Sequence, residues 1–144
     1  MPVAVSAVPQ AQRFVVLDSF RGLCALSVAL FHLHIVGGVL DTAVGARTYN
    51  SVVDGGREDL SGESYSAQVN ADSIQLLYPG GLAVSATVNS GGVQSVLSGA
   101  RTRQSIINAG GQQQVLGDAD STLVNGGEQT VGSGGIVFGT AVTN

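Results

Sequence analysis

A motif that returns at a nearly fixed interval constrains the fold of this chain more than any other feature. An apolar residue, an asparagine, a Gly-Gly pair and a glutamine recur in that order through the second half of the sequence, and the copy at Asn70 lacks only the pair. The recurring asparagines are Asn70, Asn89, Asn108 and Asn125, spaced by 19, 19 and 17 residues. A degenerate first copy begins at Val53, and a last copy begins at Val142. Self-similarity with a period near 20 residues is typical of a solenoid, in which each repeat packs against its neighbours.

The repeating unit favours strands rather than helices. A Gly-Gly pair inside a helix costs about 1 kcal/mol per glycine, and no apolar residues recur at helical spacing. Val, Ile and Thr suit short strands, and Gly and Asn accept the positive φ angles of tight turns. We therefore predict an all-β fold, a short right-handed parallel β-helix with repeats of about 19 residues over 49–144. Its coils would stack about 4.8 Å apart.

The repeat also predicts which side chains stack on one another. One expected inward ladder consists of Val69, Val88, Ile107, Val124 and Val142. A second consists of Leu77, Val96, Val115 and Val131. At one corner we expect Asn70, Asn89, Asn108 and Asn125 to stack, with each amide bonding the next. The glutamines 75, 94, 113 and 129 recur at nearly the same spacing, and we expect ladders of Asn, Ser, Thr and Gln on a flat outer face that bonds a second copy or a glycan.

The N-terminal third has a different character. Residues 1–12 contain two prolines and predict a flexible tail. Residues 13–40 predict one apolar α-helix, because 22–40 form a run of about 19 residues without formal charge. Three interpretations stay open for this helix: a transmembrane helix, the apolar region of a signal peptide, or a buried helix. Residues 41–48 would form a linker to the repeats.

Composition excludes several classes of function. The net charge is −4, and all six basic residues are arginines scattered along the sequence. The sequence therefore predicts no basic patch of the kind that binds nucleic acid. Cys24 is the only cysteine, so neither an internal disulfide nor a cysteine-based zinc site can form. No phosphate loop, nucleophile elbow or complete calcium loop occurs, and we expect no cofactor and no metal. The acidic residues Asp54, Glu58, Asp59 and Glu63 are interpreted as a charged loop or a solubilising cap.

The repeats resemble a known family. The stretch "TVNSGGVQSVLSG" and its neighbours, over about 49–144, are similar to the passenger repeats of self-associating autotransporter adhesins of Gram-negative bacteria, of the AIDA and antigen-43 type. The resemblance implies a non-enzymatic protein at the cell surface or secreted, whose partners are other copies, surface glycans or other cells. It also implies that outward Ser and Thr side chains could be glycosylated.

A second resemblance concerns residues 15–34. The stretch "LDSFRGLCALSVALFHLH" is similar to the first transmembrane helix of the acyltransferase 3 family, which O-acylates sugars of surface polysaccharides. Arg21 and His32 fall on family positions that the resemblance implies in acyl transfer, although this chain has one such helix where the family has about ten. It implies insertion of residues 22–40 into a membrane. His32 and His34 would face different directions on a helix and so form no metal pair.

Three functions remain open at this stage. The first is a surface adhesin passenger that works through a repetitive solenoid face. The second is a truncated N-terminal piece of a membrane O-acyltransferase with a repetitive extension. The third is a fused or truncated reading frame without an independent function.

Overall fold

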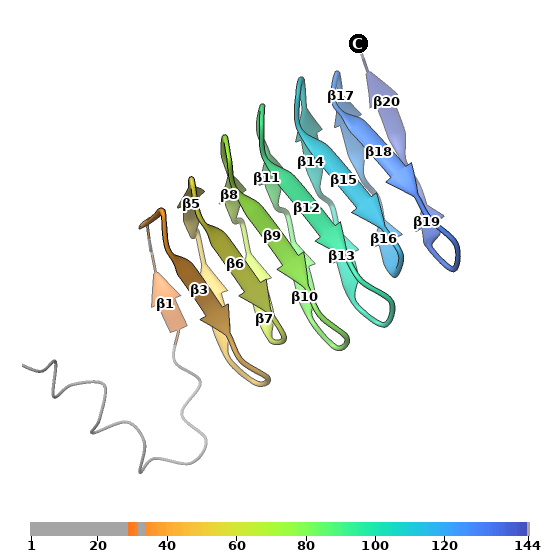
Figure 1. Ribbon diagram of the computed structural model, residues 1–144. Coiled ribbons are helices and arrows are strands. Elements are labelled where there is room, and N and C mark those ends of the chain that lie inside the picture. Colours follow the sequence, from red (N-terminus) through yellow and green to blue (C-terminus); the bar gives the residue numbers. More distant parts are fainter. Residues whose placement is uncertain (1–28, 32–33, 144) are drawn as a thin grey trace, which may run out of the picture.

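The described part of the protein is a parallel β-solenoid of about six turns. The computed structural model describes residues 29–31 and 34–143, and its coils stack along one axis (Figure 1). Each coil contributes strands to three sheets, and every strand pairs in parallel with the strand one coil away. The solenoid architecture expected from the repeats is confirmed.

The strands of the three sheets are as follows. Sheet A contains β1 (Ala29–Phe31), β4 (Arg47–Tyr49), β7 (Glu63–Tyr65), β10 (Leu82–Val84), β13 (Arg101–Arg103), β16 (Asp118–Asp120) and β19 (Ile136–Phe138). Sheet B contains β2 (His34–Val36), β5 (Val52–Asp54), β8 (Gln68–Val69), β11 (Thr87–Val88), β14 (Ile106–Asn108), β17 (Leu123–Asn125) and β20 (Ala141–Thr143). Sheet C contains β3 (Val39–Thr42), β6 (Arg57–Leu60), β9 (Ile74–Leu77), β12 (Val93–Val96), β15 (Gln112–Val115) and β18 (Glu128–Val131).

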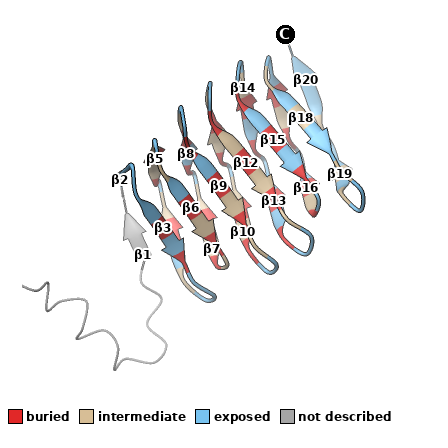
Figure 2. Ribbon diagram, viewed as in Figure 1, coloured by how far each residue is buried: buried red, intermediate tan, exposed pale blue. Residues whose placement is uncertain are grey.

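The core is a set of one-residue columns rather than a packed interior of large side chains. In sheet B, Val69, Val88 and Ile107 lie in register and form one fully buried cluster. In sheet C, Leu77, Val96 and Val115 lie in register, and none of the three is exposed. Buried and exposed positions therefore alternate along the strands (Figure 2). This alternation follows from the two-residue period of a strand, which sends successive side chains to opposite faces.

Two corners of each coil turn through a left-handed residue, and the four-residue connections between sheets C and A contain a further one. Between sheets B and C this residue is usually the first glycine of a pair, for example Gly91 with φ 77°, and it is Asp72 with φ 57° in the coil that lacks the pair. Between sheets A and B one residue in each coil turns the chain. Examples are Asn50 (φ 53°), Ser85 (φ 56°) and Gln104 (φ 54°). The backbone N–H of this corner residue donates to the carbonyl of the next coil, at 2.8 Å from Asn50 to Tyr65. The hydrogen bond between coils helps to offset the strain of a left-handed non-glycine residue.

The solenoid begins earlier than the sequence predicted. Residues 34–48 were expected to end an apolar helix and form a linker, but they contain β2, β3 and β4. The reason is that β5 and β6 offer parallel partners to β2 and β3, and Gly37-Gly38 takes the place of the Gly55-Gly56 turn. Residues 29–31 of the predicted helix form strand β1, and its other residues before 34, with the tail, lie outside the described residues. No helix among the described residues is long and apolar enough to cross a membrane.

Candidate functional site

A ladder of buried amides runs through the interior. Gln75, Gln94 and Gln113 occupy inward positions of sheet C and are at most 1% exposed, so the expectation that the glutamines form a ladder on the outer face is wrong. The Nε2 group of Gln94 donates to Oε1 of Gln75 at 2.7 Å, and that of Gln113 donates to Oε1 of Gln94 at 2.6 Å. Gln129 continues the ladder at 2.6 Å from Gln113. An unpaired buried amide would be strongly destabilising, so the ladder holds adjacent coils in register.

This ladder ends on a buried carboxylate. Glu58 is fully buried, and its Oε2 accepts from Nε2 of Gln75 at 2.7 Å. Its other oxygen, Oε1, accepts from the hydroxyls of Thr48 at 3.1 Å, Ser64 at 2.9 Å and Ser51 at 3.4 Å. The expectation that Glu58 lies in a charged loop or cap is wrong. Both carboxylate oxygens of Glu58 have hydrogen-bond donors, which makes its burial favourable. Glu58 therefore takes the place of a glutamine at the N-terminal end of the ladder.

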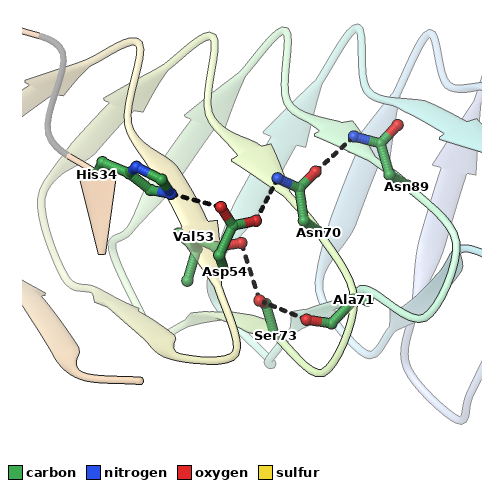
Figure 3. Close-up of polar contacts among 7 residues, drawn as sticks. All are labelled: His34, Val53, Asp54, Asn70, Ala71, Ser73 and Asn89. Carbon is green, nitrogen blue, oxygen red and sulfur yellow. Dashed lines mark hydrogen bonds and ion pairs between the residues drawn. The ribbon is translucent and has the colours of Figure 1, made fainter. Parts of the chain in front are cut away.

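A second amide ladder runs along the outside of sheet B. Asn108 donates to Asn89 at 2.9 Å, and Asn89 donates to Asn70 at 2.7 Å. Asn70 in turn donates to the carboxylate of Asp54, which His34 also contacts (Figure 3). The hydrogen bond from Asn70, followed by that from His34, holds the pKa of Asp54 below its ordinary value.

The two ladders share one direction. In both, each amide nitrogen donates toward the N-terminal coil, and the last amide donates to a carboxylate, Glu58 or Asp54. A hydroxyl donates to the opposite end, from Thr140 to Gln129 at 3.0 Å and from Thr143 to Asn125 at 3.2 Å. A carboxylate oxygen that accepts from the first amide N–H leaves that amide's own oxygen to accept from the next, so the orientation of every amide that follows is set.

Most of the outward-pointing charged and aromatic side chains lie on sheet A, where they alternate along each strand with buried residues. Arg47 donates to Glu63 at 2.7 Å, and Arg101 donates to Asp118 at 3.3 Å. Tyr65 donates to Glu63 at 2.8 Å and stacks on Tyr49 with ring centroids 5.1 Å apart. The Tyr65 hydroxyl and then the Arg47 guanidinium hold the pKa of Glu63 below its ordinary value. The same Glu63 contact raises the pKa of Arg47.

Open grooves follow this face. One of about 590 Å³ is lined by Arg47, Glu63, Leu82 and Arg101 together with glycines of the neighbouring turns. A second, of about 410 Å³, is lined by Tyr65, Val84, Arg103 and Asp120 among others. These grooves expose charged and apolar groups side by side, which suits contact with an extended polar surface rather than enclosure of a small molecule.

The structure brings together the four expected asparagines and most of the expected core residues. Val131 and Val142, also expected to be inside, are 48% and 70% exposed, because they lie on the last strands of sheets C and B and no described coil covers them. Asn70, Asn89, Asn108 and Asn125 form one hydrogen-bonded line, with 3.2 Å from Asn125 to Asn108. Val88 and Ile107 lie in the buried column of sheet B, and Val124 pairs with Ile107 at its next rung. Arg21 and His32, suggested by the acyltransferase resemblance, lie outside the described residues.

The described residues hold no accessible constellation for catalysis. Glu58 with its three hydroxyls resembles a base beside nucleophiles, but the carboxylate is fully buried. His34 lies on the outer surface of sheet B, where its ring contacts the carboxylate of Asp54. Within 34–143, no three His, Cys, Asp or Glu residues gather to hold a metal ion.

Comparisons with known proteins agree with the fold. A solved structure, the TibC-catalysed hyper-glycosylated fragment of TibA, matches with a TM-score of 0.61 and 28% sequence identity. The match covers 79% of this chain and 53% of the TibA fragment, so the chain spans about half of that structure. No protein-family model matches the chain, and neither does any curated protein.

Proposed function

We propose that this chain is a non-enzymatic passenger segment of an autotransporter adhesin, which mediates self-association or attachment through a face of its solenoid. The observation that carries the proposal is the parallel solenoid with its similarity to the TibA fragment. The repeats resemble adhesin passengers independently of that similarity. In such a fold the buried amides fix the coils, and the outward columns remain for binding.

We place this segment at the cell surface or in the secreted fraction of a Gram-negative bacterium. We also infer that the coils wind right-handedly, because β–crossover–β connections between parallel strands almost always do. Glycosylation of outward Ser and Thr is part of the same proposal. It is supported by the hyper-glycosylated state of the TibA fragment.

The direct test is display of the full chain on beads or on cells that do not aggregate. We expect aggregation, or binding to an array of surface glycans, by a chain whose far-ultraviolet circular dichroism shows β-structure. A folded chain that neither aggregates nor binds any glycan would contradict the proposal. Mass spectrometry of the chain from its native host would test the glycosylation separately.

The acyltransferase alternative rests on residues 15–34, of which the structure describes 29–31 and His34. His34 lies on a strand and contacts Asp54 rather than facing a membrane helix. An assay for acyl transfer to polysaccharide with the full chain would test this alternative. We expect no turnover above background, and the same result with Arg21→Ala. A fused or truncated reading frame would fail both the aggregation and the transfer assay.

A further inference from the structure

The outward face of sheet A carries a pattern that repeats every three coils. Its first column reads basic, acidic, apolar, basic, acidic, apolar along the solenoid. The residues of this column, all in register, are Arg47, Glu63, Leu82, Arg101, Asp118 and Ile136. The second column, in the same order of coils, is Tyr49, Tyr65, Val84, Arg103, Asp120 and Phe138.

From this pattern we propose that sheet A binds the same face of a second copy, with the two solenoids antiparallel and Leu82 at the centre. A two-fold axis along the strand direction keeps each column opposite itself and reverses its order. Arg47 of one copy then faces Asp118 of the other, and Glu63 faces Arg101. Symmetry doubles both contacts, so four ion pairs surround a contact between the two Leu82 side chains.

The second column is complementary in the same register. Tyr49 of one copy faces Asp120 of the other, where a phenol can donate to a carboxylate. Tyr65 faces Arg103, a pairing that allows a cation–π contact. The two Val84 side chains meet on the axis beside Leu82, so both columns place apolar contacts at the centre and polar ones around them.

Other arrangements of the two faces are disfavoured by charge. In a parallel arrangement the columns would exchange, so Arg101 would face Arg103 and Asp118 would face Asp120. An antiparallel copy shifted by one or two coils would also oppose like charges. A shift by three coils restores opposite charges but engages four coils instead of five. Like charges placed opposite each other select against these alternatives.

The connections between sheets C and A vary in the same way. Those before Glu63 and Asp118 contain two residues, 61–62 and 116–117, whereas those before Arg47 and Arg101 contain four, 43–46 and 97–100. In the proposed pairing each short connection of one copy lies opposite a long connection of the other, whereas the four-residue connection before Leu82, 78–81, lies opposite its own copy. Four of the five facing pairs of connections therefore join a short one with a long one.

One such interface is expected to bind weakly, whereas many interfaces between two surfaces that each carry many copies are expected to bind strongly. Five coils of about 4.8 Å and strands of about 3.3 Å per residue give a footprint of roughly 20 Å by 10 Å. This is well below the ~800 Å² per partner of a standard interface. Many copies on one surface would bind through multivalency, which is the setting in which an adhesin acts.

The test uses two charge reversals in the full chain, Glu63→Arg and Arg101→Glu, on beads of two colours. Each variant alone places like charges opposite each other twice, so we expect aggregation to fall at least about tenfold. In a mixture, the arginine introduced by the first substitution would face the glutamate introduced by the second. Beads of the two colours should therefore aggregate with one another. Wild-type aggregation should also weaken as salt is raised.

Reversal of a charge on sheet C, Glu128→Arg, is the control and should leave aggregation unchanged. Circular dichroism checks that all variants keep the fold, and misfolding cannot explain recovery on mixing. This inference rests on the proposed function, but the two fail differently. Aggregation by wild type that survives either reversal, or no recovery on mixing, overturns the pairing and leaves the adhesin proposal standing. A wild type that binds glycans without aggregating also overturns the pairing, and a wild type that does neither overturns both.

Discussion

The buried amide ladder leads to a quantitative prediction at its central rung, Gln94→Leu. Gln94 donates to Oε1 of Gln75 at 2.7 Å and accepts from Nε2 of Gln113 at 2.6 Å. It also accepts from the hydroxyl of Ser105 at 3.2 Å, which has a second partner in Thr102 at 2.6 Å. Leucine has a similar size but makes none of these bonds. The substitution therefore leaves one buried carbonyl oxygen and one buried amide without a partner.

The magnitude follows from those two groups. A buried polar group left unsatisfied costs about 1–3 kcal/mol, so two of them cost roughly 2–6 kcal/mol. The added apolar surface of leucine offsets part of this, since burying one extra methylene-sized group contributes about 0.8 kcal/mol. We expect a net loss of about 1–5 kcal/mol in the free energy of unfolding.

The assay is equilibrium unfolding in urea followed by far-ultraviolet circular dichroism. Gln114→Leu is the matched control, because Gln114 lies on strand β15 beside Gln113 but points outward and is exposed. The control should change the free energy by no more than about 0.5 kcal/mol. The slopes of the two transitions should agree, so that the midpoints can be compared directly.

A second variant sharpens the test. In Gln94→Leu with Gln113→Leu, the amide of Gln113 is gone and the next amide, on Gln129, is only half-buried. The double variant should therefore lose less than the sum of the two single losses. Equal effects of Gln94→Leu and Gln114→Leu would refute the ladder as a source of stability, and strict additivity would refute coupling between its rungs.

Three further predictions concern packing, turns and pH. Ile107→Ala removes a fully buried side chain and should cost about 2–5 kcal/mol, whereas the same change at its neighbour Ile106, 36% exposed, should cost less than half as much in the same urea assay. Gly117→Ala should lower stability by about 1–3 kcal/mol, since an added Cβ would lie 2.4 Å from two backbone carbonyl oxygens; an unchanged melting temperature would contradict this contact. The hydrogen bond from Asn70 lowers the pKa of Asp54 in the folded state, so Asp54 should stabilise the fold above its unfolded pKa near 3.8. This stabilisation should be lost as the pH falls through the lower folded pKa. Thermal melts from pH 2 to 7 should show the loss, and Asp54→Asn should remove it.

The two amide ladders show which parts of the structure could be predicted from the sequence. The spacing of the asparagines placed them on one line, because equal intervals in a solenoid mean equal positions in successive coils. The glutamines had nearly the same spacing, and the expectation that they lie on the outer face was wrong. Polar residues are normally expected outside, and only the amide of the neighbouring coil makes their burial favourable.

The N-terminal coil was missed for a related reason. A long apolar run was read as a helix by its length, although Gly37-Gly38 repeats the paired glycines of later turns. Ile35 and Leu40 point to the interior at strand spacing, but the outward residues between them, Val36 and Val39, are apolar as well. Alternation cannot be recognised where both faces of a strand are apolar, so the neighbouring coil decided the conformation.

The sequence by itself determined the period, the strand-and-turn character and the apolar columns, because these depend on which residues recur and on local backbone preferences. The tertiary structure alone decided which polar residues are buried, where the ladders end and what sheet A presents. Glu58 is the clearest case, since a carboxylate among three other acidic residues in a degenerate repeat gives no sign of burial. It becomes an interior residue only when three hydroxyls of its own and adjacent coils and one amide converge on it. The charge pattern of sheet A likewise becomes visible only when residues 16 to 19 positions apart are stacked in register.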